Sequence, residues 1–102
     1  MISSFKIAGG KVITINIVDI LKDDNPKDDS KFGEFNPANN VITIAKRVIV
    51  DGDSYVQTEE DMNRTLWHEI FHVFQFYAGF NMTEYEAQIY SNFMYEYLNT
   101  KK

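Results

Sequence analysis

Residues 58–79 read TEEDMNRTLWHEIFHVFQFYAG, and this stretch predicts the longer of two helices in the chain. Thr58 has the hydroxyl that is preferred at a helix N-cap, and the three acidic residues after it suit the positive end of the helix dipole. Gly79 readily adopts the left-handed conformation that often follows the last helical residue. We therefore expect a helix over residues 59–78.

Within this helix, residues 68–72 read HEIFH. His68 and His72 are four residues apart, so they lie one turn apart on one helix face, where both imidazoles can reach a single Zn²⁺. Glu69 would lie near the open side of such a metal, where its carboxylate can take a proton from a bound water. The string predicts a zinc site with His68 and His72 as metal ligands and Glu69 as the catalytic base.

A second helix is expected over residues 84–98, with Thr83 as its N-cap. Because the chain has no cysteine and no third histidine, the third protein ligand of a catalytic zinc would be an acidic residue. Glu84 shares a helical row with the small residues Ala87 and Ser91, which would let this helix approach the first one closely. Glu86 shares a row with bulkier aromatic residues. We therefore favour Glu84 as the third ligand and keep Glu86 as the alternative.

The first half of the chain is typical of β-strands. Two hairpins are expected, one over residues 5–20 around Gly9-Gly10 and one over residues 33–45 around the turn residues NPANN. Together with the helices, these strands predict an α+β fold, a small antiparallel or mixed β-sheet packed against two α-helices in one domain over residues 1–102.

Residues 21–31 (LKDDNPKDDSK) are charged and contain a proline, which predicts an exposed loop. Calcium binding by its aspartates (Asp23, Asp24, Asp28 and Asp29) is the alternative, but these residues lack the ordered spacing of a known calcium loop. We interpret the stretch as a solvated connection.

The composition argues against several classes of protein. Apolar residues make up 44% of the 102 residues, which is enough for a core, and fifteen acids against ten bases give a net charge of −5. Without a basic stripe, nucleic-acid binding is not expected. The absence of cysteine excludes a disulfide-stapled fold. We see no signal-peptide pattern and no apolar run of membrane-spanning length, so a cytoplasmic protein is expected.

Three stretches, GEFNPANNVITIA, TLWHEIFHVFQFYAG and TEYEAQIYSNF, together resemble the gluzincin metallopeptidases over residues 33–98. The chain looks most like the smallest members, the mini-gluzincins and the short HExxH proteins of phages and mobile elements. The family has a glutamate ligand followed by a small residue three positions on and a polar residue four positions on. Glu84, Ala87 and Gln88 match this pattern. The polar residue of the family is typically Asp or Asn and orients a ligand histidine, so Gln88 departs from it.

The resemblance implies a zincin-like fold in which the strand at residues 41–45 is the edge strand above the zinc and holds an extended peptide by strand addition. The family also has a His or Tyr that stabilises the transition state, and no residue here matches it. Tyr77, Tyr90 and Tyr95 are candidates by chemistry alone. For each of them, a tyrosine at the rim of the core is the other interpretation.

We expect a zinc metallopeptidase that acts on a peptide or protein substrate. Zn²⁺ held by His68, His72 and Glu84 would lower the pKa of its water, and Glu69 would take the proton and deliver it to the leaving amine. Three alternatives stay open: a zinc-binding regulatory module without turnover, a latent enzyme whose site is capped, and a structural domain without zinc. The intact Glu69 favours the enzyme over the module, because a site without turnover needs no base.

Overall fold

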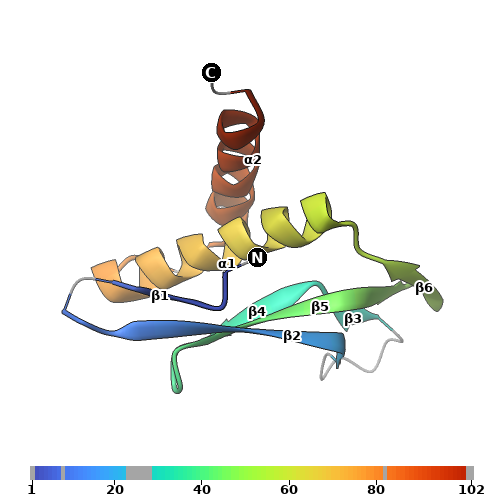
Figure 1. The fold of residues 1–102 in the computed structure, drawn as a ribbon, viewed down its shortest axis with the longest axis horizontal. Coiled ribbons are helices and arrows are strands. Elements are labelled where there is room, and N and C mark those ends of the chain that lie inside the picture. Colours follow the sequence, from blue (N-terminus) through green and yellow to red (C-terminus); the bar gives the residue numbers. More distant parts are fainter. Residues whose placement is uncertain (1, 8, 23–28, 82, 101–102) are drawn as a thin grey trace.

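The computed structural model describes residues 2–7, 9–22, 29–81 and 83–100, and within them the chain has an α+β fold. A mixed six-stranded sheet lies along one side of helix α1, and helix α2 projects from the other side of α1 (Figure 1). The elements are β1 (Ser4–Lys6), β2 (Val12–Lys22), β3 (Ser30–Lys31), β4 (Gly33–Asn36), β5 (Val41–Val50), β6 (Asp53–Val56), α1 (Glu59–Ala78) and α2 (Glu84–Thr100).

The main path of the sheet has the order β1-β2-β5-β4, with β3 paired to β2 and β6 paired to β5. Both predicted hairpins are confirmed, since β1 is antiparallel to β2 and β4 is antiparallel to β5. The sheet is mixed because β2 and β5, far apart in sequence, are parallel to each other.

The prediction of a loop over residues 21–31 is wrong at both ends of that range, where the chain forms strands. Leu21 and Lys22 belong to β2, and they pair with Lys31 and Ser30 of β3. The interior of that loop, residues 23–28, lies outside the described residues, and with it most of the aspartates considered for calcium. Asp29 is described, and its carboxylate accepts a hydrogen bond of 2.8 Å from the backbone amide of Asp51. This hydrogen bond therefore joins the residue before β3 to the β5–β6 turn.

The prediction that residues 41–45 form the edge strand is also wrong. These residues belong to β5, which has β2 on one side, from Thr14↔Val41 to Val18↔Ala45, and β4 on the other. Apart from Thr43, the run VITIA is apolar on both faces of the strand, which is typical of a central strand, and three of its five residues are buried. The edge strand at this end of the sheet is β4.

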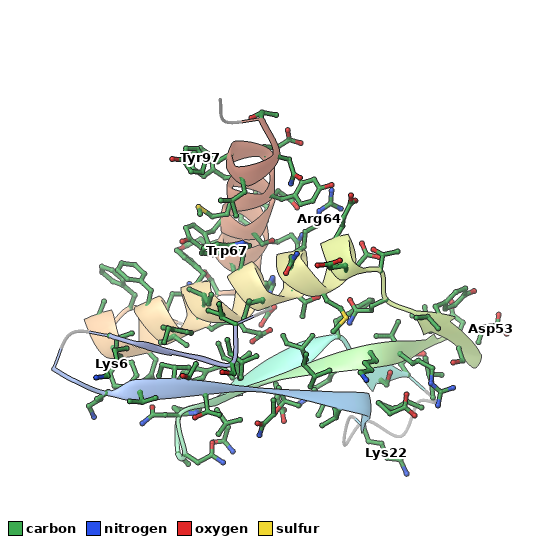
Figure 2. All side chains as sticks on the ribbon, viewed as in Figure 1. Lys6, Lys22, Asp53, Arg64, Trp67 and Tyr97 are labelled. Carbon is green, nitrogen blue, oxygen red and sulfur yellow. The ribbon has the colours of Figure 1, made fainter. Side chains whose placement is uncertain are left out.

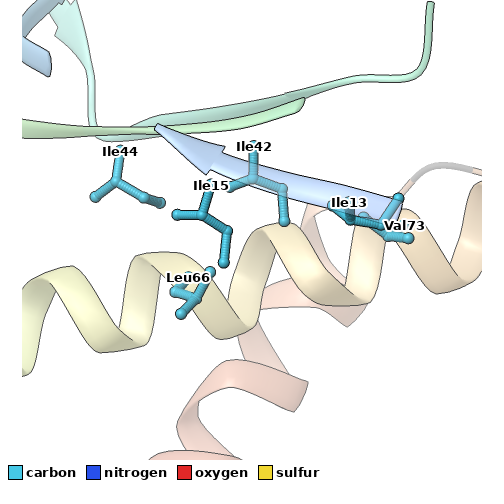
Figure 3. Close-up of a cluster of buried hydrophobic side chains, with 6 residues drawn as sticks. All are labelled: Ile13, Ile15, Ile42, Ile44, Leu66 and Val73. Atoms are coloured by element: carbon cyan, nitrogen blue, oxygen red, sulfur yellow. The ribbon is translucent and has the colours of Figure 1, made fainter. Parts of the chain in front are cut away.

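The core lies between the sheet and α1 (Figure 3). Alternate residues of the two parallel strands point to the same face of the sheet, as the period of two requires. Their isoleucines meet the apolar side of α1, and burying each such side chain contributes about 1.5–3 kcal/mol. The buried cluster consists of Ile13, Ile15, Ile42, Ile44, Leu66 and Val73.

Both helices begin where the sequence predicts. The Thr58 hydroxyl accepts a hydrogen bond from the Asp61 amide, and Gly79 adopts the left-handed conformation at a φ of 78°, so both ends of α1 are confirmed. On α2, Ala87 and Ser91 are buried, which confirms that the small-residue face packs on α1. No helix among the described residues is long and apolar enough to cross a membrane.

Candidate metal centre

Two histidines on α1 and one carboxylate on α2 converge. Glu84 Oε2 lies 2.7 Å from His68 Nε2, and Glu84 Oε1 lies 2.9 Å from His72 Nε2. Because Glu84 is the first residue of α2, the close packing of this helix on α1 brings its carboxylate to both imidazoles. Glu86, the alternative ligand, is exposed and is not among the described residues that line the adjoining cavity.

A second carboxylate, that of Glu69, lies beside the same histidines. Ligand atoms of His68, Glu69 and His72 are all within 4.8 Å of one another. The two glutamates differ sharply in exposure: the Glu84 side chain is 79% exposed, whereas Glu69 is only 6% exposed. Either glutamate is therefore near enough to complete a metal site with the histidines, and their surroundings distinguish them.

The surroundings of Glu69 favour the protonated form in the metal-free protein. Burial, reinforced by the negative charges of Glu84 and Glu34, raises the pKa of Glu69 from 4.5 to about 8. The charge of Lys31 and a hydrogen bond from the backbone amide of Phe35 act in the opposite direction but are outweighed. Glu69 is thus a carboxyl group whose pKa lies near neutral pH, which suits a general base.

The surroundings of Glu84 favour the ionised form. Its partial burial alone would raise the pKa, but the hydrogen bonds with His68 and His72 and the charges of both histidines together lower the pKa below its ordinary value. A carboxyl group must be deprotonated to bind a metal ion. Of the two glutamates, Glu84 is therefore the better ligand and Glu69 the better base.

The donor set fits zinc, which binds two imidazoles and a carboxylate in many catalytic sites. His72 provides a direct test of this fit, because it is only 4% exposed. Its Nε2 lies 2.9 Å from Glu84 Oε1, an ion-pair contact, and makes no other hydrogen bond among the described residues. A metal ion beside this nitrogen and the carboxylate oxygen would coordinate both atoms.

A cavity of about 840 Å³ opens beside these residues. One wall comes from β3, β4 and the segment between them, and the other from residues 61–72 of α1 and residues 84–91 of α2. The lining residues are Ser30, Lys31, Phe32, Gly33, Glu34, Phe35, Gln57, Asp61, Arg64, Thr65, His68, Glu69, His72, Glu84, Gln88 and Ser91. The four residues with candidate metal or base roles therefore share one cavity with the edge strand.

The three tyrosines proposed as transition-state stabilisers are not among the described residues that line this cavity. Tyr77 donates a hydrogen bond to Asn40 at the turn before β5. Tyr90 stacks on Phe71 with ring centroids 4.8 Å apart. Tyr95 donates a hydrogen bond of 2.9 Å to Glu60. The structure therefore favours the interpretation of all three as packing residues.

Sequence reasoning missed several residues of the site. Gln75 forms a hydrogen bond with His72, and it could have been noticed as an amide in an otherwise largely apolar stretch, one turn after a histidine. Arg64 lines the cavity one turn before His68, on the side of α1 that faces α2 (Figure 2), with its guanidinium 3.9 Å from the centre of the Tyr95 ring. The hydrogen bond from the Phe35 amide to Glu69 could not be predicted from the sequence, because it depends on the order of the strands in the sheet.

Comparisons of the chain with protein-family models, with curated proteins and with solved structures found no match.

Proposed function

We propose that this protein is a zinc-dependent metallopeptidase of gluzincin type. One observation carries the proposal: two imidazole nitrogens and an ionised carboxylate converge beside a buried second carboxylate, on the wall of an open cavity. His68, His72 and Glu84 would hold the metal. A bound zinc ion supplies a Lewis acid that makes water more acidic and polarises a carbonyl group.

Glu69 is the general base in this proposal. Its carboxylate accepts the proton of the attacking water as the water oxygen bonds to the peptide carbonyl carbon. As the C–N bond breaks, Glu69 returns the proton to the leaving amine. Burial suits both steps, because a carboxyl group with a proton affinity near neutral pH can accept and release a proton.

The edge strand β4 is the proposed binding site for the substrate backbone. Phe32 accepts a hydrogen bond from the Ala45 amide, so its carbonyl faces β5. Backbone groups alternate in direction along an antiparallel strand, and the Phe35 amide accordingly faces away from β5, toward Glu69. An extended peptide could add to this edge beside the Phe35–Glu69 hydrogen bond and lie across the cavity. The substrate is therefore a peptide or protein in extended conformation.

A second candidate is a zinc-binding module without turnover, or a latent enzyme. It is favoured by one observation, that none of the three candidate tyrosines lines the described cavity. Arg64 is a cation on the cavity wall and offers another source of positive charge for a developing oxyanion. The cytoplasmic location expected from the sequence belongs to the same proposal, and nucleic acid is not a proposed partner.

Metal content and peptide cleavage, measured on the same preparation, test the proposal. We expect about one zinc per chain and cleavage of an unstructured protein substrate that a chelator abolishes. Glu69→Gln should keep the zinc and lose cleavage, because an amide cannot accept the proton. Bound zinc without cleavage in the parent would favour the non-catalytic module. A chain that takes up no zinc on reconstitution would exclude both.

A further inference from the structure

Gln75 is a buried amide that joins the two helices of the metal centre. It lies on α1 one turn after His72 and is only 1% exposed. Its Oε1 is 2.8 Å from His72 Nδ1, and its Nε2 donates a hydrogen bond of 3.1 Å to Thr83 Oγ1. Both ends of this buried side chain therefore have hydrogen-bond partners, one on each side of the helix connection.

The contact with His72 determines which ring nitrogen carries the hydrogen. An amide oxygen only accepts hydrogen bonds, so His72 Nδ1 must be the donor. In a neutral imidazole, the lone pair is then on Nε2, which is the atom that faces Glu84. This nitrogen is buried and makes no other hydrogen bond among the described residues, so a metal ion beside Glu84 could bind it.

The contact with Thr83 fixes the other helix. Thr83 directly precedes Glu84, the first residue of α2, so a hydrogen bond to Thr83 restrains the start of that helix. The backbone of Gln75 acts in the same direction, since its carbonyl accepts a hydrogen bond of 2.8 Å from the Phe80 amide in the connection between the helices. Gln75 thus holds His72 and the residue next to Glu84 in one hydrogen-bonded arrangement.

We propose that Gln75 is the positioning residue of the metal centre: it fixes the His72 ring with the Nε2 lone pair toward Glu84 and holds Glu84 against it. This inference rests on the metal-binding part of the proposed function. Partners of this kind commonly change metal affinity by 10–100-fold when they are removed. Gln88, at the position where the resemblance places an orienting residue, instead donates to Asn92 and is exposed.

The test compares Gln75→Met with Gln88→Met. Methionine has nearly the shape of glutamine but makes no strong hydrogen bonds, so Gln75→Met removes both contacts while the site stays filled. Zinc affinity, measured by competition with a chromophoric chelator, should fall 10–100-fold for Gln75→Met and stay within about twofold for Gln88→Met. Gln75→Glu keeps an acceptor for His72 Nδ1 and should recover much of the lost affinity.

A second measurement separates positioning from general support of the fold. In ¹⁵N NMR of the metal-free protein, the Nδ1–H of His72 should give a slowly exchanging, downfield resonance that Gln75→Met loses and Gln75→Glu keeps. Because no metal is present, this readout does not depend on whether the chain binds zinc or cleaves peptides. An unchanged Nδ1–H resonance in Gln75→Met, or zinc affinity equal to that of the parent, would overturn the proposal.

A matched pair of variants tests the hydrogen bond from Gln75 to Thr83 separately. Thr83→Val removes the acceptor of Gln75 Nε2, whereas Thr83→Ser keeps it, and both leave the Gln75–His72 contact in place. Zinc affinity should fall for Thr83→Val and be kept by Thr83→Ser. If Gln75→Met does not fold, this pair and Gln75→Glu carry the test, and equal affinities for the valine and serine variants would refute the role of Gln75 in holding Glu84.

Discussion

Replacing Glu69 by glutamine should stabilise the metal-free protein, by an amount that grows with pH. Glu69 is 6% exposed, and burial together with Glu84 and Glu34 raises its pKa from 4.5 to about 8. The folded state therefore binds this proton more tightly than the unfolded chain does. Stability linked to the proton is fully present below the unfolded pKa of 4.5 and is lost as the pH rises through about 8.

The magnitude follows from the difference between the two pKa values. Each pKa unit corresponds to about 1.4 kcal/mol, so the complete loss is about 5 kcal/mol, and the part between pH 5 and pH 7 is about 2 to 3 kcal/mol. A small domain has a total stability of about 5–15 kcal/mol, so this loss is large enough to measure. Glutamine has nearly the same shape and does not titrate, so Glu69→Gln should lack this pH dependence.

The assay is urea unfolding in the presence of a chelator at several pH values, for the parent and for Glu69→Gln. The control is Glu86→Gln, which makes the same change of charge at an exposed position of α2. The free energies of unfolding of parent and Glu69→Gln should be similar near pH 4.5 and diverge steadily above it, while Glu86→Gln follows the parent. Parallel curves for parent and Glu69→Gln would refute the burial argument for the base.

Three further predictions concern the ligands and the edge strand. His72→Ala should lose zinc, as metal analysis would show, because two remaining ligands rarely hold the ion. Glu84→Ala should weaken zinc binding far more than Glu86→Ala in chelator competition, and equal affinities would contradict the assignment of Glu84. Gly33→Ala should destabilise the metal-free protein by about 1–3 kcal/mol in urea unfolding, since the new Cβ would lie 2.6 Å from Thr65 Cγ2. Adding Thr65→Ser should restore part of the loss, and no recovery would mean that the strain lies elsewhere.

The helical half of the fold could be predicted from the sequence because its signals are local. The hydroxyl of Thr58 and the left-handed Gly79 mark both ends of α1, and the structure places those ends where the sequence does. The placement of Glu84 beside the histidines also follows from local spacing. Ala87 and Ser91 leave room for α2 to approach α1, and a helix start at Glu84 then brings its carboxylate to the metal centre.

The sheet and the supporting contacts could not be predicted as well, because they depend on pairing between distant segments. Nothing in the sequence states that β2 and β5 are parallel neighbours, and this pairing is what makes β5 central and leaves β4 at the edge. The hydrogen bond from Phe35 to Glu69 follows from that strand order. Gln75 is different, since its spacing from His72 was visible, but its second partner, Thr83, lies beyond the end of the helix.

The proposed metal centre needs two carboxylates with opposite properties, and the two helices and the sheet provide them separately. Glu84 comes from the exposed start of α2, where contact with the histidines lowers its pKa and favours the ionised form that a ligand needs. Glu69 lies between α1 and the sheet, where burial raises its pKa toward the range in which a base exchanges protons at neutral pH. The positive charge of a bound ion would favour the ionised form of Glu69 and so prepare it to accept a proton. Exchanging the roles would require an ionised ligand in the buried position, where desolvation disfavours it, so the fold itself distinguishes ligand from base.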